Sequence, residues 1–295
     1  MKPTRLHAAW APWVFTAPFL LLFLLFTAWP LLQSLVLAFQ QTFGPRSTRF
    51  VGFDNFAFLL RDPLFWQAVR NTVIYTAGAI FVQLPVALGL ALLLNRPQLR
   101  GRALFRLIFF SPSLVGLVFV GLMFHLMFQK HTGLINAGLH TLFSSWDPEF
   151  AWLDAYIMPS LIIASVWLYA GFNMIYFLAA LQNVNRELME AAEIDGAGPW
   201  ARFRHVVLPE IRPVAGFVVL LSVIGSFQLF ELPWVLLNNS GGPGNNGLTI
   251  VMYLFQTGFL TGDLGYASAI GWVLGLILVG AAWAQARAAR KEISG

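Results

Sequence analysis

The chain has 295 residues, with 18 lysines and arginines against 13 aspartates and glutamates, and it contains no cysteine. Hydrophobic residues make up 58% of it and charged residues only 11%, whereas soluble domains hold about 45–50% apolar and about 25% charged residues. This composition excludes an ordinary soluble enzyme, a disordered chain and a disulfide-stapled secreted domain. The charges lie between long apolar stretches, so the basic balance indicates membrane topology and not a nucleic-acid partner.

Six intervals between charged residues each predict one membrane-spanning helix. Each interval can hold the roughly 20 apolar residues that a helix needs to cross the hydrocarbon core, and unpaired backbone groups are too costly in lipid for an open structure. We therefore expect an all-α integral membrane protein with six transmembrane helices. The intervals lie between Arg5 and Arg46, Arg70 and Arg96, Arg106 and Lys130, Asp154 and Arg186, Arg212 and Glu231 (with apolar residues continuing to Leu237), and Asp263 and Arg287.

One further apolar stretch, from Leu248 to Leu260, has only 13 residues and lies between turn-forming sequences. It is too short to cross the bilayer, so we expect an interfacial or re-entrant helix there.

The positive charges predict the orientation of the chain. Thirteen of the 18 lysines and arginines lie in the two tails and in the second-to-third and fourth-to-fifth connections, and five lie on the other side. By the positive-inside rule, both termini are cytoplasmic, and an even number of spans likewise requires both termini on the same side. We expect a cytoplasmic tail over residues 1–12, a six-helix transmembrane domain over 13–286, and a second cytoplasmic tail over 287–295.

The most informative segment is the long cytoplasmic connection over residues 183–213, between the fourth and fifth spans. Glu187 to Ile194 is rich in helix formers, and Asp195-Gly196 should end that helix because glycine tolerates the left-handed conformation. Pro199 suits the first turn of a second helix, and Pro209 and Pro213 are expected to set the entry into the fifth span. The sequence thus predicts a helix, a sharp turn and a second helix, exposed on the cytoplasmic side.

This connection resembles the EAA loop of ABC importer membrane subunits, in the variant found in carbohydrate-uptake permeases such as the maltose and glycerol-3-phosphate importers. The spacing makes the match specific, although Glu-Ala-Ala alone is common and the bland alternative is an amphipathic connector that ends in glycine. The matching residues are Glu190, Ala191, Ala192, Asp195, Gly196, Ala197, Phe203, Leu208 and Pro209.

Other segments resemble the same family, so the resemblance covers nearly the whole chain. They are the stretch from Phe50 to Phe56 with Asp62-Pro63 and Asn71-Thr72, the turn from Leu94 to Arg106, and Gly241-Gly242-Pro243 with the stretch from Asp263 to Ala269.

The resemblance implies a type I ABC importer permease fold in the bacterial inner membrane. It also implies a complex with a second permease subunit, by family habit a distinct chain, two ATP-binding subunits and an extracytoplasmic solute-binding protein. The matching EAA-loop residues would dock on the ATPase, with Gly196 as the sharp turn. The sequence has no glycine-rich phosphate loop and no catalytic or metal-ligand motif, so we expect no enzyme activity, with ATP and Mg²⁺ bound by the partner ATPase.

The fifth predicted span supplies the first candidates for the solute pathway. Glu231 is the one carboxylate well inside an apolar stretch, and such residues usually face a cavity; the alternative is a position near the external interface. Pro233 should loosen the helix there. The family resemblance places solute contacts in this part of the chain, which favours Gln228, Phe230, Glu231 and Trp234.

The fourth span supplies a second set of candidates. Tyr169, Asn173 and Tyr176 recur at spacings of four and three and therefore share one helix face. This face suits a pathway, and it suits a polar contact between helices equally well. The connection from Asn238 to Asn246 is expected to lie outside and to meet the binding protein, although a turn-rich connector would have the same composition.

These observations predict the permease subunit of an ATP-driven, binding-protein-dependent importer for a sugar or oligosaccharide. A phosphorylated polyol such as glycerol phosphate remains an alternative solute. The rival class is an ion-driven secondary transporter, which tends to place several ionisable groups within the bilayer.

Overall fold

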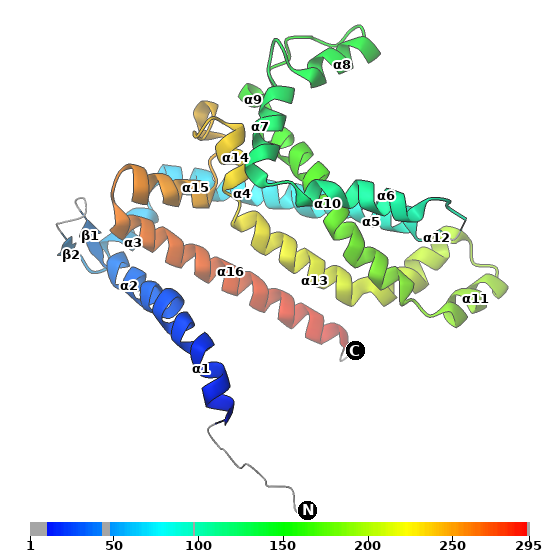
Figure 1. Cartoon of the computed structure of the whole chain (residues 1–295), viewed down its shortest axis with the longest axis horizontal. Coiled ribbons are helices and arrows are strands. Elements are labelled where there is room, and N and C mark those ends of the chain that lie inside the picture. The colour runs from blue at the N-terminus through cyan, green and yellow to red at the C-terminus, as the bar shows by residue number, and fades with distance from the viewer. Residues whose placement is uncertain (1–10, 43–47, 97, 294–295) are drawn as a thin grey trace, which may run out of the picture. The chain divides into compact units, whose positions relative to one another are not determined.

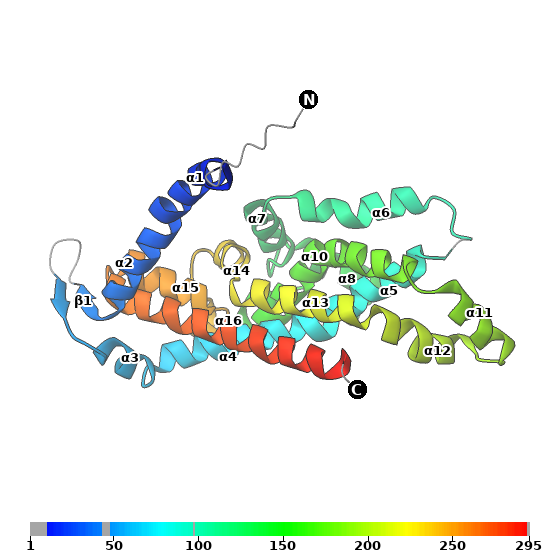
Figure 2. The ribbon, with the colours of Figure 1, turned by 90° about the horizontal axis from the view of Figure 1, so that it is seen from below.

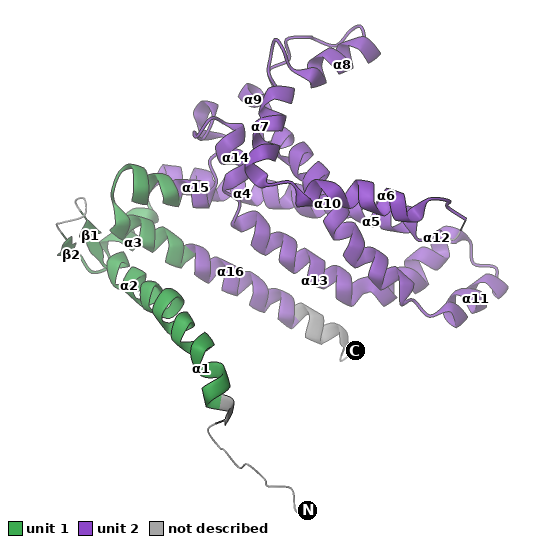
Figure 3. Cartoon of the chain, in the orientation of Figure 1, with its two compact units in different colours: residues 1–61, 254–273 green, residues 62–253, 274–295 purple. Residues whose placement is uncertain are grey.

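The computed structural model describes residues 11–42, 48–96 and 98–293, with side chains from 13 to 287 outside the gaps. The predicted tail over 1–12 therefore lies almost wholly outside the described residues, as do residues 294–295 of the predicted C-terminal tail. The chain divides into two compact units (Figure 3), Met1–Arg61 with Leu254–Val273 as unit 1, and Asp62–Tyr253 with Leu274–Gly295 as unit 2.

Unit 1 begins with one long apolar helix and a short hairpin. Its α1, η1 and α2 run without interruption, and an 18-residue window between Trp13 and Ala38 has no buried residue within the described structure, as expected of a helix that faces lipid. The elements are α1 (Ala11–Phe23), the π-turn η1 (Leu24–Ala28), α2 (Trp29–Ala38), the antiparallel strands β1 (Gln40–Thr42) and β2 (Thr48–Phe50), α3 (Asp54–Leu59) and the π-turn η7 (Gln256–Leu260).

The start of the last helix, α16 (Leu264–Ile293), packs tightly within unit 1. A Cβ atom at Gly265 would lie 1.8 Å from the backbone oxygen of Gln40, so only glycine fits. Thr42 Oγ1 accepts a hydrogen bond from the Gly265 N–H at 3.1 Å, and Trp272 Nε1 donates to Ser34 Oγ at 3.2 Å. Helix α16 continues past residue 287, so most of the predicted C-terminal tail is helical.

Unit 2 contains the remaining spans and both connections of interest (Figure 1). Its elements are α4 (Pro63–Gly78), the π-turn η3 (Ala79–Gln83), α5 (Leu84–Leu94), α6 (Arg102–Phe110), the 3₁₀ turn η4 (Ser111–Leu114), α7 (Leu117–Met127), α8 (Leu134–Leu142), α9 (Trp152–Ala155), α10 (Ile157–Gln182), α11 (Arg186–Ile194), α12 (Pro199–Arg202), the π-turn η5 (Phe203–Val207), α13 (Leu208–Phe227), α14 (Glu231–Leu236) and the 3₁₀ turn η6 (Pro243–Asn245), followed by α15 (Ile250–Phe255) at the boundary of the units.

The prediction of six spans is confirmed with one difference. Five continuous helices in the described chain are long and apolar enough to cross a membrane, and a sixth span is a pair of helices bent by 97°, Arg102–Leu114 and Leu117–Met127. At Pro112 the helix tightens into the 3₁₀ turn η4, and it breaks at Val115 and Gly116, which have extended backbone. The short apolar helix predicted within 248–260 is also present, over Ile250–Leu260.

Three π-turns interrupt the long helices at a recurring position, two residues before a proline. In each case, the residue between the π-turn and the proline donates its N–H to the carbonyl of the first residue of the π-turn, five residues back. This longer hydrogen bond widens the helix and makes room for the proline ring. The π-turns and their prolines are η1 with Pro30, η3 with Pro85 and η5 with Pro209.

The core of unit 2 has two hydrophobic clusters. One joins α7, α10 and α14 through residues such as Phe124, Leu161 and Leu232. The other joins α5, α10 and α13, which run close together in both ribbon views (Figures 1 and 2), and Met189 and Phe203 pack against it. The cytoplasmic loop is therefore connected to the core of the spans by packed side chains.

Candidate coupling loop and substrate pathway

The cytoplasmic connection folds into the helix, turn and helix that its sequence predicts. The side chain of Asn185 caps α11 by accepting a hydrogen bond from the Glu187 N–H at 2.8 Å. The helix ends at Ile194, Gly196 two residues later has φ +77°, and the Ala197 N–H donates to the Ala192 carbonyl at 2.9 Å. This left-handed end reverses the chain within a few residues.

The entry into the fifth span differs from the prediction. Pro209 and Pro213 do not mark its start, because α12, η5 and α13 form one continuous helix from Pro199 to Phe227. The π-turn η5 allows Pro209 to sit inside this helix. The second helix of the loop is thus continuous with the fifth span.

The loop displays most of the EAA-loop residues on its surface. Glu190, Ala191, Asp195 and Gly196 are exposed, whereas Phe203 is half-buried against the core. Ala192 and Ala197 are half-buried, and Leu208 and Pro209 are exposed on the continuous helix.

The structure adds two apolar side chains that the sequence comparison did not single out. Ile194 is 88% exposed and Trp200 is 69% exposed. Large apolar side chains exposed beside a turn are typical of protein-binding surfaces. Their presence in an otherwise charged connection could have marked them as candidates in the sequence.

An ion pair joins the two helices of the loop. Arg202 Nη1 lies 2.7 Å from Glu193 Oε2, joining α12 to α11. The ring of Trp200 stacks on Phe203 at 5.5 Å. The Arg202–Glu193 ion pair therefore links the end of α11, next to Ile194 and Gly196, to the second helix of the loop.

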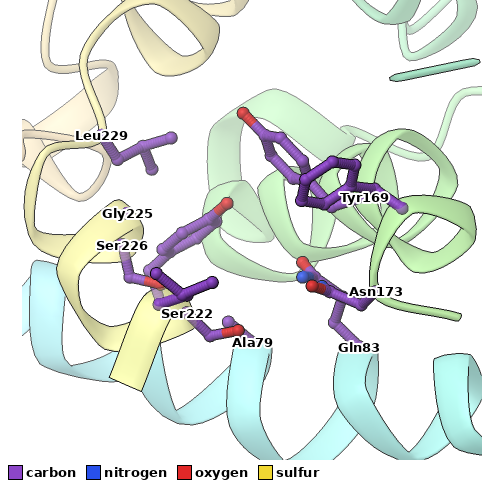
Figure 4. A pocket seen from close by; sticks show the side chains of 11 residues that line it. Ala79, Gln83, Tyr169, Asn173, Ser222, Gly225, Ser226 and Leu229 are labelled. Atoms are coloured by element: carbon purple, nitrogen blue, oxygen red, sulfur yellow. The ribbon is translucent and has the colours of Figure 1, made fainter. Parts of the chain in front are cut away.

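Unit 2 also contains a pocket of about 190 Å³ between three spans (Figure 4). Its lining is mixed aromatic, amide and hydroxyl, and none of the lining residues in the described chain carries a charge. The lining residues are Tyr75, Ala79 and Gln83 from α4 and η3, Tyr169, Phe172 and Asn173 from α10, and Leu221, Ser222, Gly225, Ser226 and Leu229 from α13 and its end.

Gln83 is the most unusual of these residues. It lies on the π-turn η3 and is 4% exposed, and its Oε1 has no hydrogen-bond partner among the residues that the structure describes. Gln83 and Asn173 both line the pocket (Figure 4). A buried acceptor without a donor costs stability, and π-turns are frequent at functional sites, so Gln83 is a candidate functional residue of this pocket.

The structure separates the predicted pathway residues of the fourth span. Tyr169 and Asn173 line the pocket. Tyr176 does not, because its ring packs edge-on against Phe172 at 5.3 Å and Phe217 at 6.1 Å.

The predicted pathway residues of the fifth span lie beyond the end of that span. Helix α13 ends at Phe227, and Glu231 begins the separate short helix α14, where it is exposed. The prediction that Glu231 and Pro233 lie inside a spanning helix is therefore wrong. The break is tolerated because Thr249 Oγ1 donates to the freed Leu229 carbonyl at 2.7 Å.

None of Gln228, Phe230, Glu231 and Trp234 lines this pocket. Trp234 stacks on Phe230 at 5.6 Å.

Sequence reasoning missed the contribution of the second span and the middle of the fifth. Tyr75, Ala79 and Gln83 recur every fourth residue, as do Ser222 and Ser226, so the helical spacing was the signal. Across the described residues, no three His, Asp or Glu side chains come together as a metal site.

The comparisons with known proteins agree with this architecture. Residues 83–291 match the model of a protein family described as the binding-protein-dependent transport system inner membrane component. The chain belongs to this family. It is therefore an inner-membrane permease component of a binding-protein-dependent transport system and not its ATPase, as the EAA-loop resemblance predicts.

Several relatives match along nearly their whole length. The arabinooligosaccharides transport system permease protein AraP of Bacillus subtilis is 39% identical over 91% of this chain and 85% of its own. The lactose transport system permease protein LacF of Rhizobium radiobacter is 36% identical, covering 95% and 94%. The sn-glycerol-3-phosphate transport system permease protein UgpA of Yersinia pestis is 31% identical, covering 99% of each.

Solved structures share the fold. A bacterial ABC transporter involved in the import of the acidic polysaccharide alginate superposes with a TM-score of 0.79 at 24% identity, over 94% of this chain and 96% of that one. The alginate transporter in complex with its pentasaccharide-bound periplasmic protein gives a TM-score of 0.83 at 22% identity, over 96% and 94%. The expected ABC importer permease fold is thereby confirmed.

Proposed function

We propose that this chain forms half of the pathway of an ATP-driven importer for an uncharged sugar or oligosaccharide. The observation that carries the proposal is the pocket between α4–η3, α10 and α13, with its phenol, amide and hydroxyl groups and its free Gln83 oxygen. Sugar rings stack on aromatic faces, and their hydroxyls exchange hydrogen bonds with such groups.

The charge of the pocket favours a neutral solute over a phosphorylated one. A phosphate or carboxylate requires arginine, lysine or a row of backbone N–H groups for tight binding, and the residues described around the pocket offer no cationic side chain. The named substrates of AraP and LacF are sugars, and these two relatives are more similar to this chain than UgpA is.

The size of the pocket supports a second permease subunit. Ligand pockets usually enclose about 300–1,000 Å³, whereas this one encloses about 190 Å³. A partner permease, which by family habit is a distinct chain, would supply the facing wall.

On the cytoplasmic side, the loop over residues 183–213 would dock on one of two ATP-binding subunits, which hold ATP and Mg²⁺. Its exposed face offers Glu190, Asp195 and the apolar Ile194 around the turn at Gly196. Closure of the ATPases on ATP would move this loop, and the continuous helix from Pro199 to Phe227 would carry the motion to the pocket wall.

On the outer side, residues 238–246 would meet the solute-binding protein. The segment is rich in asparagine and glycine and exposes Asn238, Asn239, Ser240 and Asn246, which suits a polar protein surface.

Co-purification from native membranes tests this function. The tagged chain should recover an ATPase, a second six-span subunit and a solute-binding protein, and the ligand of that binding protein should be an uncharged sugar. Recovery of the chain alone from a detergent that preserves such assemblies would favour an ion-driven secondary transporter. A binding protein that carries only an anionic solute would contradict the assignment of the pocket.

A further inference from the structure

One row of side chains on a single helix reaches both the outer loop and the pocket. Five residues of the helix Pro63–Leu94 recur every fourth position and form one continuous i, i+4 stripe, which winds around the helix by about 40° per step. The outer two contact the connection after α14, and the inner three line the pocket. The stripe consists of Gln67, Asn71, Tyr75, Ala79 and Gln83.

The outer two residues hold the backbone of the 238–248 loop. Asn71 is 5% exposed, and its Nδ2 donates to the carbonyls of Asn245 at 2.8 Å and Leu248 at 3.0 Å. Gln67 Nε2 donates to the Gly244 carbonyl at 2.5 Å. The loop has backbone hydrogen bonds of its own, such as Gly247 N–H to the Gly241 carbonyl at 2.8 Å and Leu248 N–H to the Asn245 carbonyl at 3.1 Å. The two side-chain amides add the bonds that join this loop to α4.

The loop needs such support because much of its backbone is left-handed. This conformation costs roughly 1–2 kcal/mol per residue for side chains other than glycine, although asparagine tolerates it better than most. Several such residues within one short segment favour a loop that changes shape once its anchors are removed. The left-handed residues are Asn238, Asn239, Gly242, Gly244 and Asn245.

We propose that Gln67 and Asn71 are positioning residues that hold the 238–248 loop in the shape that docks the solute-binding protein. The loop exposes the side chains of Asn238, Asn239 and Asn246, while its carbonyls face α4. The same stripe continues through Tyr75, Ala79 and Gln83. One helix therefore holds both the loop and one wall of the pocket, which fixes the position of the loop relative to the pocket. This inference rests on the proposed function of the loop.

The test uses the complete transporter, with its partner subunits and its binding protein, in lipid nanodiscs. Asn71→Asp keeps the shape of the side chain but removes both donors and places a carboxylate against two carbonyls. We expect the binding-protein concentration that half-stimulates ATP hydrolysis to rise about tenfold, equivalent to about 1.4 kcal/mol. The basal ATPase rate and the maximal stimulated rate should stay unchanged, because the pocket and the cytoplasmic loop are intact.

Two further variants keep the outcome interpretable. Gln67→Glu removes the single donor to Gly244 from a half-buried site and should give a smaller shift in the same direction. Thr76→Val is the matched control, since Thr76 is buried on the same helix but bonds only the Thr72 carbonyl. It should leave the half-stimulating concentration unchanged.

Hydrogen exchange should report the same effect independently, with faster exchange over residues 238–248 in Asn71→Asp and not in Thr76→Val. Equal behaviour of Asn71→Asp and Thr76→Val in both measurements would overturn the inference while leaving the importer function intact. If the binding protein fails to stimulate even the wild-type complex, the proposed function itself is wrong.

Discussion

At the scale of single residues, Gly196 offers a clean test of the coupling loop. Its φ of +77° is costly for any residue with a Cβ atom, although nothing lies within 4 Å of the position that the Cβ would occupy. Gly196→Val should therefore disturb the turn through the backbone alone and reduce uptake at least tenfold, while the protein still inserts. Transport into proteoliposomes measures the effect.

Gly198 provides the matched control, because it also has open space around it but an ordinary φ of −65°. Gly198→Ala should transport at nearly the wild-type rate. Normal uptake by Gly196→Val would remove the turn from the coupling mechanism.

For Gln83 we expect a substitution to raise stability and to weaken uptake. Its buried Oε1 has no partner in the described chain, and an unpaired buried acceptor costs about 1–3 kcal/mol. Gln83→Met, which keeps the length of the side chain, should raise the thermal unfolding temperature in detergent and raise the KM for uptake severalfold.

Gln182→Met, at the exposed end of α10, should change neither the unfolding temperature nor the KM. A loss of stability in Gln83→Met would mean that the oxygen is bonded in the protein, and the argument for a solute contact there would fail.

At the scale of elements, the packing of α6 against α10 depends on one position without a side chain. A Cβ at Gly171 would lie 1.7 Å from the backbone oxygen of Phe109. Gly171→Ala should push α6 away from α10 and destabilise the protein by about 1–3 kcal/mol, the usual cost of overpacking.

The comparison is Gly89→Ala, in the middle of α5, where nothing lies within 4 Å of the added atom. That change should be neutral or should stabilise by about 0.5–1 kcal/mol, since alanine is the better helix former. Thermal unfolding of both variants in one detergent decides the matter, and equal melting temperatures would contradict the close contact.

The elements also show what the sequence could and could not predict. Charge-free intervals located the six spans because burial of a charge in lipid is costly, and the glycine turn at 196 followed from local backbone preferences. The end of α13 at Phe227 was missed because apolar residues continue to Leu237, and the hydrogen bond from Thr249 that stabilises the break comes from 20 residues further along. The bend after Pro112 was missed for a related reason, since proline is often accommodated in spanning helices.

At the scale of the whole molecule, the pocket could be predicted only in part. Tyr169 and Asn173 share a helix face that the sequence reveals, but their meeting with Gln83 and Ser226 depends on how three spans pack. Tyr176 shares the same predicted face and lies elsewhere, against Phe172. Helical spacing therefore selects candidates, and tertiary packing decides among them.

The source of energy is also a property of the whole assembly, and it separates the importer from its rival class. The spans carry few ionisable side chains, and Glu231 lies outside them on α14, so the membrane part offers little to couple to a proton or sodium gradient. Uptake of the neutral sugar into cells should therefore stop when ATP is depleted, and it should continue for the first seconds after a protonophore is added.

The same uptake should be inhibited by an excess of unlabelled neutral oligosaccharide. A uronic or phosphorylated sugar should not inhibit it, because the described wall of the pocket has no cation to pair with an anion. Uptake that follows the ion gradient in ATP-depleted cells would contradict the ATP-driven mechanism, and competition by the anionic sugar would contradict the neutral pocket while leaving that mechanism standing.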